Sequence, residues 1–157
     1  MSTLYPLPDG ARVKALFGML FDGLEVKAGA ATDAASNAYV AVFVADDGKP
    51  VALCACDIAF AANGSAALSM LPPAVAKEAA KSKQLTDVMV ANLAEIMNIG
   101  TRLLLTDTSP HLKLDRVYPS AGVPPAAAAV TGAAQGRVDF DINLAKYGGG
   151  HLTLFSL

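Results

Sequence analysis

The stretch "AYVAVFVADDGKPVALCACDIAF", residues 38–60, decides the fold class because it predicts two adjacent antiparallel strands. Its two apolar runs, rich in β-branched and small residues, flank Asp46-Asp47-Gly48, a turn sequence typical of a β-hairpin. Cys54 and Cys56 alternate along the second run, so both thiols are predicted on the same face of one strand. Neighbours at this spacing rarely satisfy disulfide geometry, which favours buried core thiols.

Helices and further strands are predicted on both sides of this hairpin. Asp9 is a candidate N-cap, and apolar residues recur every three or four positions from Val13 to Phe21. Pro72-Pro73 breaks one helical region from the next. The predicted helices cover about 9–23, part of 61–71, 74–83 and about 85–105, and the predicted strands cover 24–31 and 112–119.

The C-terminal segment "GRVDFDINLAKYGGGHLTLFSL", residues 136–157, predicts two strands around a glycine-rich turn at Gly148-Gly149-Gly150. A phosphate-binding loop is disfavoured because no Lys-Ser/Thr pair and no helix follow the glycines. Residues 124–134 predict a Pro-initiated helix or a loop. Antiparallel strands with packed helices indicate an α+β fold, which we expect to be one domain over residues 1–157 with an N-terminal arm at 1–8.

Composition excludes several classes of protein. Of the 157 residues, 54% are hydrophobic and 17% charged, which disfavours disorder. The formal net charge is −2 and the basic residues are scattered, so we expect neither nucleic acid nor a membrane surface as a partner. No apolar run approaches the roughly 18 residues of a membrane span, and no signal peptide is recognisable. These features favour a cytoplasmic protein. The histidines His111 and His151 have no metal-binding spacing with the two cysteines.

The predicted helix at 85–105 has two contrasting faces when residues are placed 100° apart. One face is apolar and should pack on the core; it comprises Leu85, Met89, Leu93, Ile96, Met97, Gly100, Leu103 and Leu104. The other should point outward; it comprises Asp87, Ala91, Ala94, Glu95, Asn98, Thr101 and Arg102.

Glu95 and Asn98 are the candidate functional residues of the outward face. Ala91 and Ala94 flank them, and these small side chains would leave a low platform that a partner could approach closely. Arg102 extends the platform as a third candidate docking residue. The alternative is an ordinary solvated surface on which Glu95 and Arg102 interact loosely.

The segment "NLAEIMNIG", residues 92–100, resembles the Glu-x-x-Asn signature of the CheC/CheX/FliY family of chemotaxis phosphatases. Glu95 and Asn98 match the central pair, and Pro119 falls about where the family has a proline after the motif. Ala91 departs from the pattern, since the family typically has an acidic residue or serine there. One motif is present, which resembles the single-site CheX arrangement.

The resemblance implies a phosphatase acting on the phosphoaspartate of a CheY-like response regulator. Asn98 would position the attacking water, and Glu95 would pair with the regulator's active-site lysine. The regulator would supply Mg²⁺, so no metal or other cofactor of the chain's own is expected. Single-site members of the family are often dimers, which makes a homodimer an expectation.

Two alternatives stay open. One is a catalytically degenerate CheX-like module that only binds a signalling partner or dimerises, and Ala91 favours it. The other is a structural or ligand-binding protein in which the Glu95–Asn98 spacing is accidental. That second alternative predicts that the chain itself covers the face around the pair.

Overall fold

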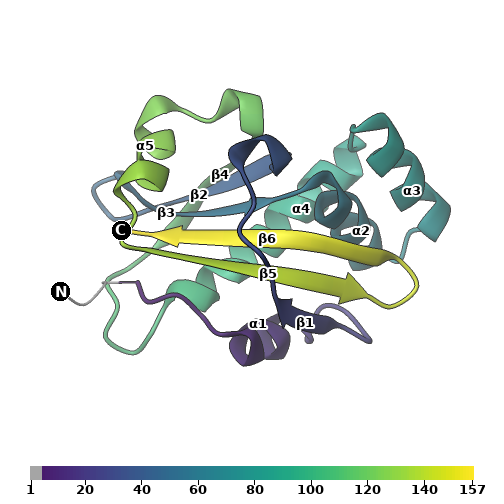
Figure 1. The fold of residues 1–157 in the computed structure, drawn as a ribbon, viewed down its shortest axis with the longest axis horizontal. Helices are drawn as coiled ribbons and strands as arrows, with labels where there is room; N and C mark the ends of the chain where they lie inside the picture. Colours follow the sequence, from purple (N-terminus) through teal and green to yellow (C-terminus); the bar gives the residue numbers. More distant parts are fainter. Residues whose placement is uncertain (1–4) are drawn as a thin grey trace.

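In the computed structural model, which describes residues 5–157, six antiparallel strands form one sheet in the order β1-β5-β6-β3-β2-β4 (Figure 1). The strands are β1 (Glu25–Ala28), β2 (Tyr39–Val44), β3 (Pro50–Cys56), β4 (Lys113–Pro119), β5 (Gly136–Leu144) and β6 (Gly148–Ser156). The predicted hairpin is confirmed as β2 and β3, with Gly48 at a positive φ of 80° in its turn. The α+β fold class is confirmed.

Residues 5–157 form five α-helices, of which four pack on this sheet. The five are α1 (Gly10–Phe17), α2 (Ile58–Leu68), α3 (Pro73–Ser82), α4 (Asp87–Gly100) and α5 (Pro125–Ala133). The exception is α3, which packs on α2. A 3₁₀ turn, η2 (Thr101–Leu104), continues α4, and short 3₁₀ turns η1 (Ala34–Ser36) and η3 (Ser120–Gly122) lie in connections. No helix among the residues described has both the length and the apolar character needed to cross a bilayer.

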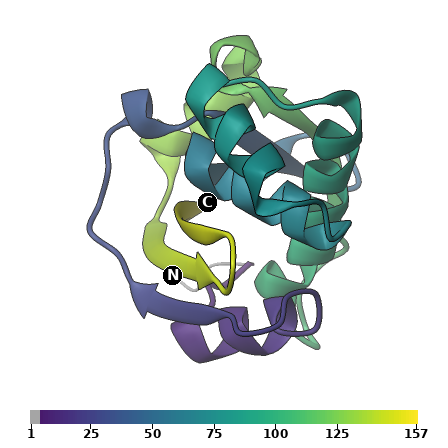
Figure 2. The same cartoon turned by 90° about the vertical axis from the view of Figure 1, so that its right-hand side faces the viewer.

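The two faces of the sheet carry different layers. Ala41 and Phe43 of β2 point into the large core under α1, α2 and α4, whereas Val40 and Val42 point to the opposite side, where α5 packs. β2 is therefore buried on both faces, which explains why its sequence is apolar throughout instead of alternating. Figure 2 shows the helical layer on one side and the β1–β2 connection on the other. That connection, residues 29–38, is called the strap below.

Local sequence signals explain most helix ends. Asp9 and Asp57 accept hydrogen bonds from backbone N–H groups three residues on, as N-caps of α1 and α2. Pro73 and Pro125 each begin a helix at its first position, where a missing N–H costs nothing. The prediction that α1 extends to about Gly23 is wrong, because the helix ends at Phe17 with Gly18 as its C-cap. Residues 1–4 of the predicted N-terminal arm lie outside the described residues.

The predicted glycine turn is also wrong. The β5–β6 turn is formed by residues 145–147, and the three glycines belong to β6. A Cβ on Gly150 would lie 2.5 Å from the backbone of Phe60, so glycine is required there for α2 to approach the sheet. Cys54 and Cys56 are buried free thiols as predicted, and burial raises the pKa of Cys54 to about 12.

Candidate functional site on helix α4

Helix α4 is anchored on both its N-terminal and its core side. Thr86 caps it by accepting a hydrogen bond from the backbone N–H of Met89. The predicted apolar face is confirmed, since Met89, Leu93, Ile96 and Met97 are each at most 1% exposed. These side chains place α4 firmly on the sheet, so the opposite face has a defined orientation.

The outward face contains both residues of the Glu-x-x-Asn pair. Glu95 and Asn98 are exposed, as are Ala91 and Arg102, while Ala94 is half-buried. Within residues 5–157, Asn92 provides the only side-chain hydrogen bonds of α4, and Glu95 and Asn98 form neither hydrogen bonds nor ion pairs. Their polar atoms are therefore available to a partner, and the described chain does not cover them.

Val88 belongs to the same face, although the sequence analysis did not single it out. It is 56% exposed and precedes Glu95 by seven residues, two helical turns. The exposed row Val88, Ala91, Glu95, Asn98 and Arg102 is called the α4 stripe below. An exposed valine could have been recognised as unusual on a solvated helix face.

Thr101 was predicted to point outward, and this is wrong. The residue is 7% exposed, and its hydroxyl has no hydrogen-bond partner within residues 5–157. At 100° per residue, Thr101 lies only about 40° of rotation from Met97, which is 1% exposed. Thr101 therefore belongs to the edge of the apolar face.

Two polar side chains fix the stripe from its sides. Asn92 donates from Nδ2 to the carbonyl oxygen of Ser65, 2.9 Å away, and to Oγ of Ser69, 2.6 Å away, which joins α4 to α2. Arg12 of α1 donates from Nη2 to the carbonyl oxygens of Arg102, at 2.7 Å, and Leu105. A guanidinium at these last carbonyls is favoured by the helix dipole. The stripe is thus a rigid platform, suited to placing a side chain precisely in a partner's cleft.

The other sequence candidates lie away from the stripe. Pro119 ends β4 and lines a hollow of about 380 Å³ with Tyr39, Ile58 and Lys83, which contains no residue of the stripe. His111 is exposed, and its Nδ1 lies 2.7 Å from Oδ1 of Asp46. Among the residues described, no group of three or more His, Cys, Asp or Glu side chains is arranged to hold a metal ion.

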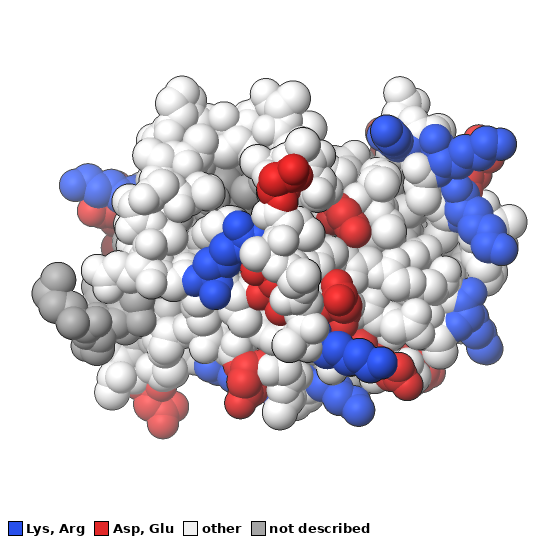
Figure 3. Space-filling view, in the orientation of Figure 1, with Lys and Arg blue, Asp and Glu red and all other residues white. Residues whose placement is uncertain are grey.

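A second polar region was missed by the sequence analysis. On the sheet face crossed by the strap, alternate residues of β5 and β6 form the β5–β6 polar cluster, defined as Arg137, Asp139, Asp141, His151 and Thr153. The alternation of charge in "RVDFD" is a signal for such a face. Elsewhere on that side, acidic and basic side chains are interspersed (Figure 3).

Comparisons with known proteins identify the fold. No protein-family model matches the sequence, and no curated protein matches it. A chain of the crystal structure of the FliM–SpeE complex from H. pylori is 13% identical over 94% of this chain and 78% of that chain, with a TM-score of 0.61. The FliM middle domain from H. pylori is 12% identical over 94% and 82%, with a TM-score of 0.56.

A chain of the CheX–CheY–BeF₃–Mg²⁺ complex from Borrelia burgdorferi also matches, with 11% identity, 92% coverage of both chains and a TM-score of 0.42. At these identities the FliM likenesses establish the fold. The chain has the CheC/FliM-like fold, so the predicted CheC/CheX-like architecture is confirmed as architecture.

Proposed function

We propose that the α4 stripe docks on the phosphorylated receiver domain of a CheY-type response regulator and accelerates hydrolysis of its aspartyl phosphate. The observation that carries this proposal is that Glu95 and Asn98 are exposed and unengaged within residues 5–157, on one face of an anchored helix. The small side chain of Ala91 lies between them and Val88, so a partner's backbone can come close. The resemblance of residues 92–100 to the Glu-x-x-Asn motif gives the surface its chemistry.

The reaction requires little from this chain. Water attacks the phosphorus, the bond from phosphorus to the aspartyl oxygen breaks, and the products are inorganic phosphate and the regulator's carboxylate. The regulator's Mg²⁺ and lysine bear the charge of the phosphoryl oxygens. The carboxamide of Asn98 accepts and donates hydrogen bonds, so it can hold the water in line with the breaking bond. The water's proton leaves to the phosphate or to solvent.

The remaining polar residues of the stripe act in docking. Glu95 lies one helical turn before Asn98, and its carboxylate pairs with the regulator's lysine, which sets the register of docking. Arg102, one turn beyond Asn98, faces the acidic rim of the receiver site. In this proposal the chain acts in the cytoplasm, where response regulators are found. It also forms a homodimer, and analytical ultracentrifugation would measure the mass of that dimer.

The test is phosphate release from response regulators of the same cell, charged with Mg²⁺ and a small phosphodonor. Asn98→Ala is expected to lower the accelerated rate about 100-fold, since the water loses its position. Glu95→Ala is expected to raise KM more than it lowers kcat. Asn143→Ala and Glu25→Ala remove the same groups from exposed positions outside the stripe and should keep wild-type rates. Equal rates for Asn98→Ala and Asn143→Ala would refute the assignment.

A second candidate function is a binding module with the same docking surface and no catalysis. Ala91 favours it, because the acidic or serine side chain typical of the family is absent. FliM, which has this fold, is found in a complex with SpeE, so the fold also serves in protein complexes. Regulator binding that is lost on Ala91→Arg, without any acceleration of phosphate release by the wild type, would select the binding module.

A further inference from the structure

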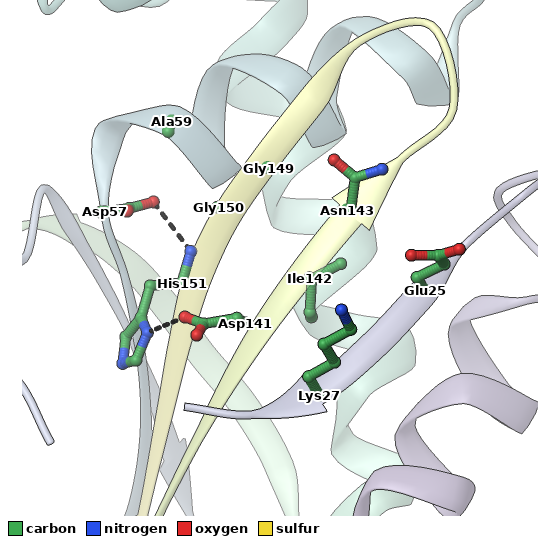
Figure 4. Close-up of a pocket in the computed structure, with 10 residues that line it drawn as sticks. All are labelled: Glu25, Lys27, Asp57, Ala59, Asp141, Ile142, Asn143, Gly149, Gly150 and His151. Carbon is green, nitrogen blue, oxygen red and sulfur yellow. Dashed lines mark hydrogen bonds and ion pairs between the residues drawn. The ribbon is translucent and has the colours of Figure 1, made fainter. Parts of the chain in front are cut away.

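The β5–β6 polar cluster holds one histidine between two carboxylates. Nδ1 of His151 lies 2.8 Å from Oδ1 of Asp141, and its Nε2 lies 2.9 Å from Oδ1 of Asp139. The His151 side chain is 12% exposed and that of Asp139 is 6% exposed. Figure 4 shows the imidazole beside Asp141, at one end of a hollow of about 530 Å³.

This geometry requires the imidazolium form of His151. A carboxylate only accepts hydrogen bonds, and a neutral imidazole donates from only one of its two nitrogens. With both nitrogens facing carboxylate oxygens, loss of one proton leaves a nitrogen lone pair against Asp139 or Asp141. The desolvation that lowers the pKa of His151 is outweighed by its hydrogen bonds to Asp141 and Asp139, so the net pKa is raised.

Charged groups from every neighbouring element surround this histidine. From β5, Arg137 donates to both oxygens of Asp139, and from α2 the N-cap Asp57 accepts the backbone N–H of His151, 3.1 Å away. From β1, Lys27 and Glu25 line the same hollow (Figure 4). Solvent therefore reaches the cluster from the hollow, while its inner side is closed.

The strap is fastened to this cluster by few contacts. Gly29 donates from its backbone N–H to the carbonyl oxygen of Asp139, 2.9 Å away, and Arg137 donates from Nη2 to the carbonyl oxygen of Thr32, 2.6 Å away. A Cβ on Gly29 would lie 2.9 Å from Cε1 of His151, so the strap backbone packs directly against the imidazole. Most of residues 30–36 are exposed, and such a segment has little stability of its own.

We propose that the strap is a pH-sensitive cover of this sheet face, closed while His151 is an imidazolium bridging Asp139 and Asp141 and loosened when His151 loses its proton. Deprotonation of His151 removes one charge-assisted hydrogen bond next to the backbone contact of Gly29 with Asp139. Because the pKa of this histidine is raised by folding, its contribution to stability is complete at pH values below the pKa of the unfolded chain. That contribution is lost as the pH rises through the pKa of the folded protein. The strap therefore loosens on the alkaline side. This inference does not depend on the phosphatase proposal.

The test is hydrogen exchange of the strap amides, above all Gly29, across a pH series corrected for intrinsic exchange, beside an NMR titration of the imidazoles. In the wild type, protection is expected to fall at least about tenfold as His151 deprotonates. His151→Gln should remove this step. His111→Gln is the matched control, because it replaces the only other histidine, also beside an aspartate, and should keep the step.

Asp141→Asn provides a second variant, since Asp141 is exposed and its replacement should not prevent folding. Removing this carboxylate lowers the pKa of His151, so the imidazole titration and the strap step should move together to lower pH. The proposal is overturned if wild-type protection does not change while His151 titrates. It is also overturned if the strap step stays in place in Asp141→Asn while the titration moves.

Discussion

The α4 stripe and the β5–β6 polar cluster both contain polar side chains, but they use them in opposite ways. In the stripe, Glu95 and Asn98 point to solvent and have no partner within residues 5–157. In the cluster, Asp139 is nearly buried and bonded to three side chains: Arg137, His151 and Thr153. Unengaged polar groups on a rigid helix are free to act on a partner, whereas engaged ones hold the fold together. Substitutions in the stripe should therefore change the action on a partner, and substitutions in the cluster should change the stability of the fold.

The largest effect on stability is expected at Asp139. Asp139→Ala leaves Arg137 without its carboxylate and His151 with Asp141 alone, and should lower the free energy of unfolding by about 3 kcal/mol, as for other broken buried ion pairs. Its hydrogen bonds to Arg137, His151 and Thr153 outweigh desolvation and lower the Asp139 pKa to about 2. A carboxyl group whose pKa is lowered by folding stabilises the fold at pH values above its pKa in the unfolded chain. This stabilisation is lost as the pH falls through the pKa in the folded protein. The loss of stability in Asp139→Ala, relative to the wild type, should therefore become smaller in strong acid.

Asn98→Ala is the matched substitution in the stripe. It removes an exposed side chain that has no hydrogen bond within residues 5–157, and should change the unfolding free energy by less than about 0.5 kcal/mol. Urea unfolding of both variants at neutral pH makes the comparison. Similar losses in the two variants would mean that Asn98 is a structural residue and that the stripe is not a free surface.

Gly150→Ala should have the next largest effect. The new methyl would meet the Phe60 backbone at 2.5 Å, so α2 or β6 must shift, at a cost of about 2 kcal/mol. Gly132→Ala is the control, because that glycine lies in α5 with nothing within 4 Å of an added Cβ. There alanine should stabilise slightly through helix propensity. Thermal unfolding of the pair tests whether the β6 glycines serve helix packing, and equal melting temperatures would refute that role.

The stripe could be predicted from the sequence because its information is local. One helical period sorted residues 85–105 into faces, and the structure places Glu95 and Asn98 outward as that period requires. The hairpin at 38–60 was equally local, since its turn and both strands lie in one segment. The error at Thr101 arose at the edge of the apolar face, because this residue lies only about 40° of helical rotation from the buried Met97.

The polar cluster could not be predicted in the same way, because its contacts join distant segments. Thr32 meets Arg137 across 105 positions of sequence, and Asp57 meets His151 across 94. His151 has no spacing pattern of its own, and its role depends on the register that sets it opposite Asp141. The glycines beside it were interpreted as a turn for the same reason, since only the packing of α2 shows why Gly150 is needed.

Two buried threonines give the smallest and most direct test of this contrast. Thr101, which follows α4, has a buried hydroxyl without a hydrogen-bond partner within residues 5–157, whereas the hydroxyl of Thr153 donates to Oδ1 of Asp139, 2.7 Å away. Valine keeps the shape of threonine and removes the hydroxyl. Thr101→Val should therefore raise the unfolding free energy by up to about 1 kcal/mol, because an unsatisfied polar group disappears. Thr153→Val should lower it by about 1 kcal/mol, because a charged acceptor loses its donor. Opposite signs in parallel urea titrations would show that the same substitution removes a cost at one site and a bond at the other, whereas a loss in Thr101→Val would mean that its hydroxyl has a partner in solution.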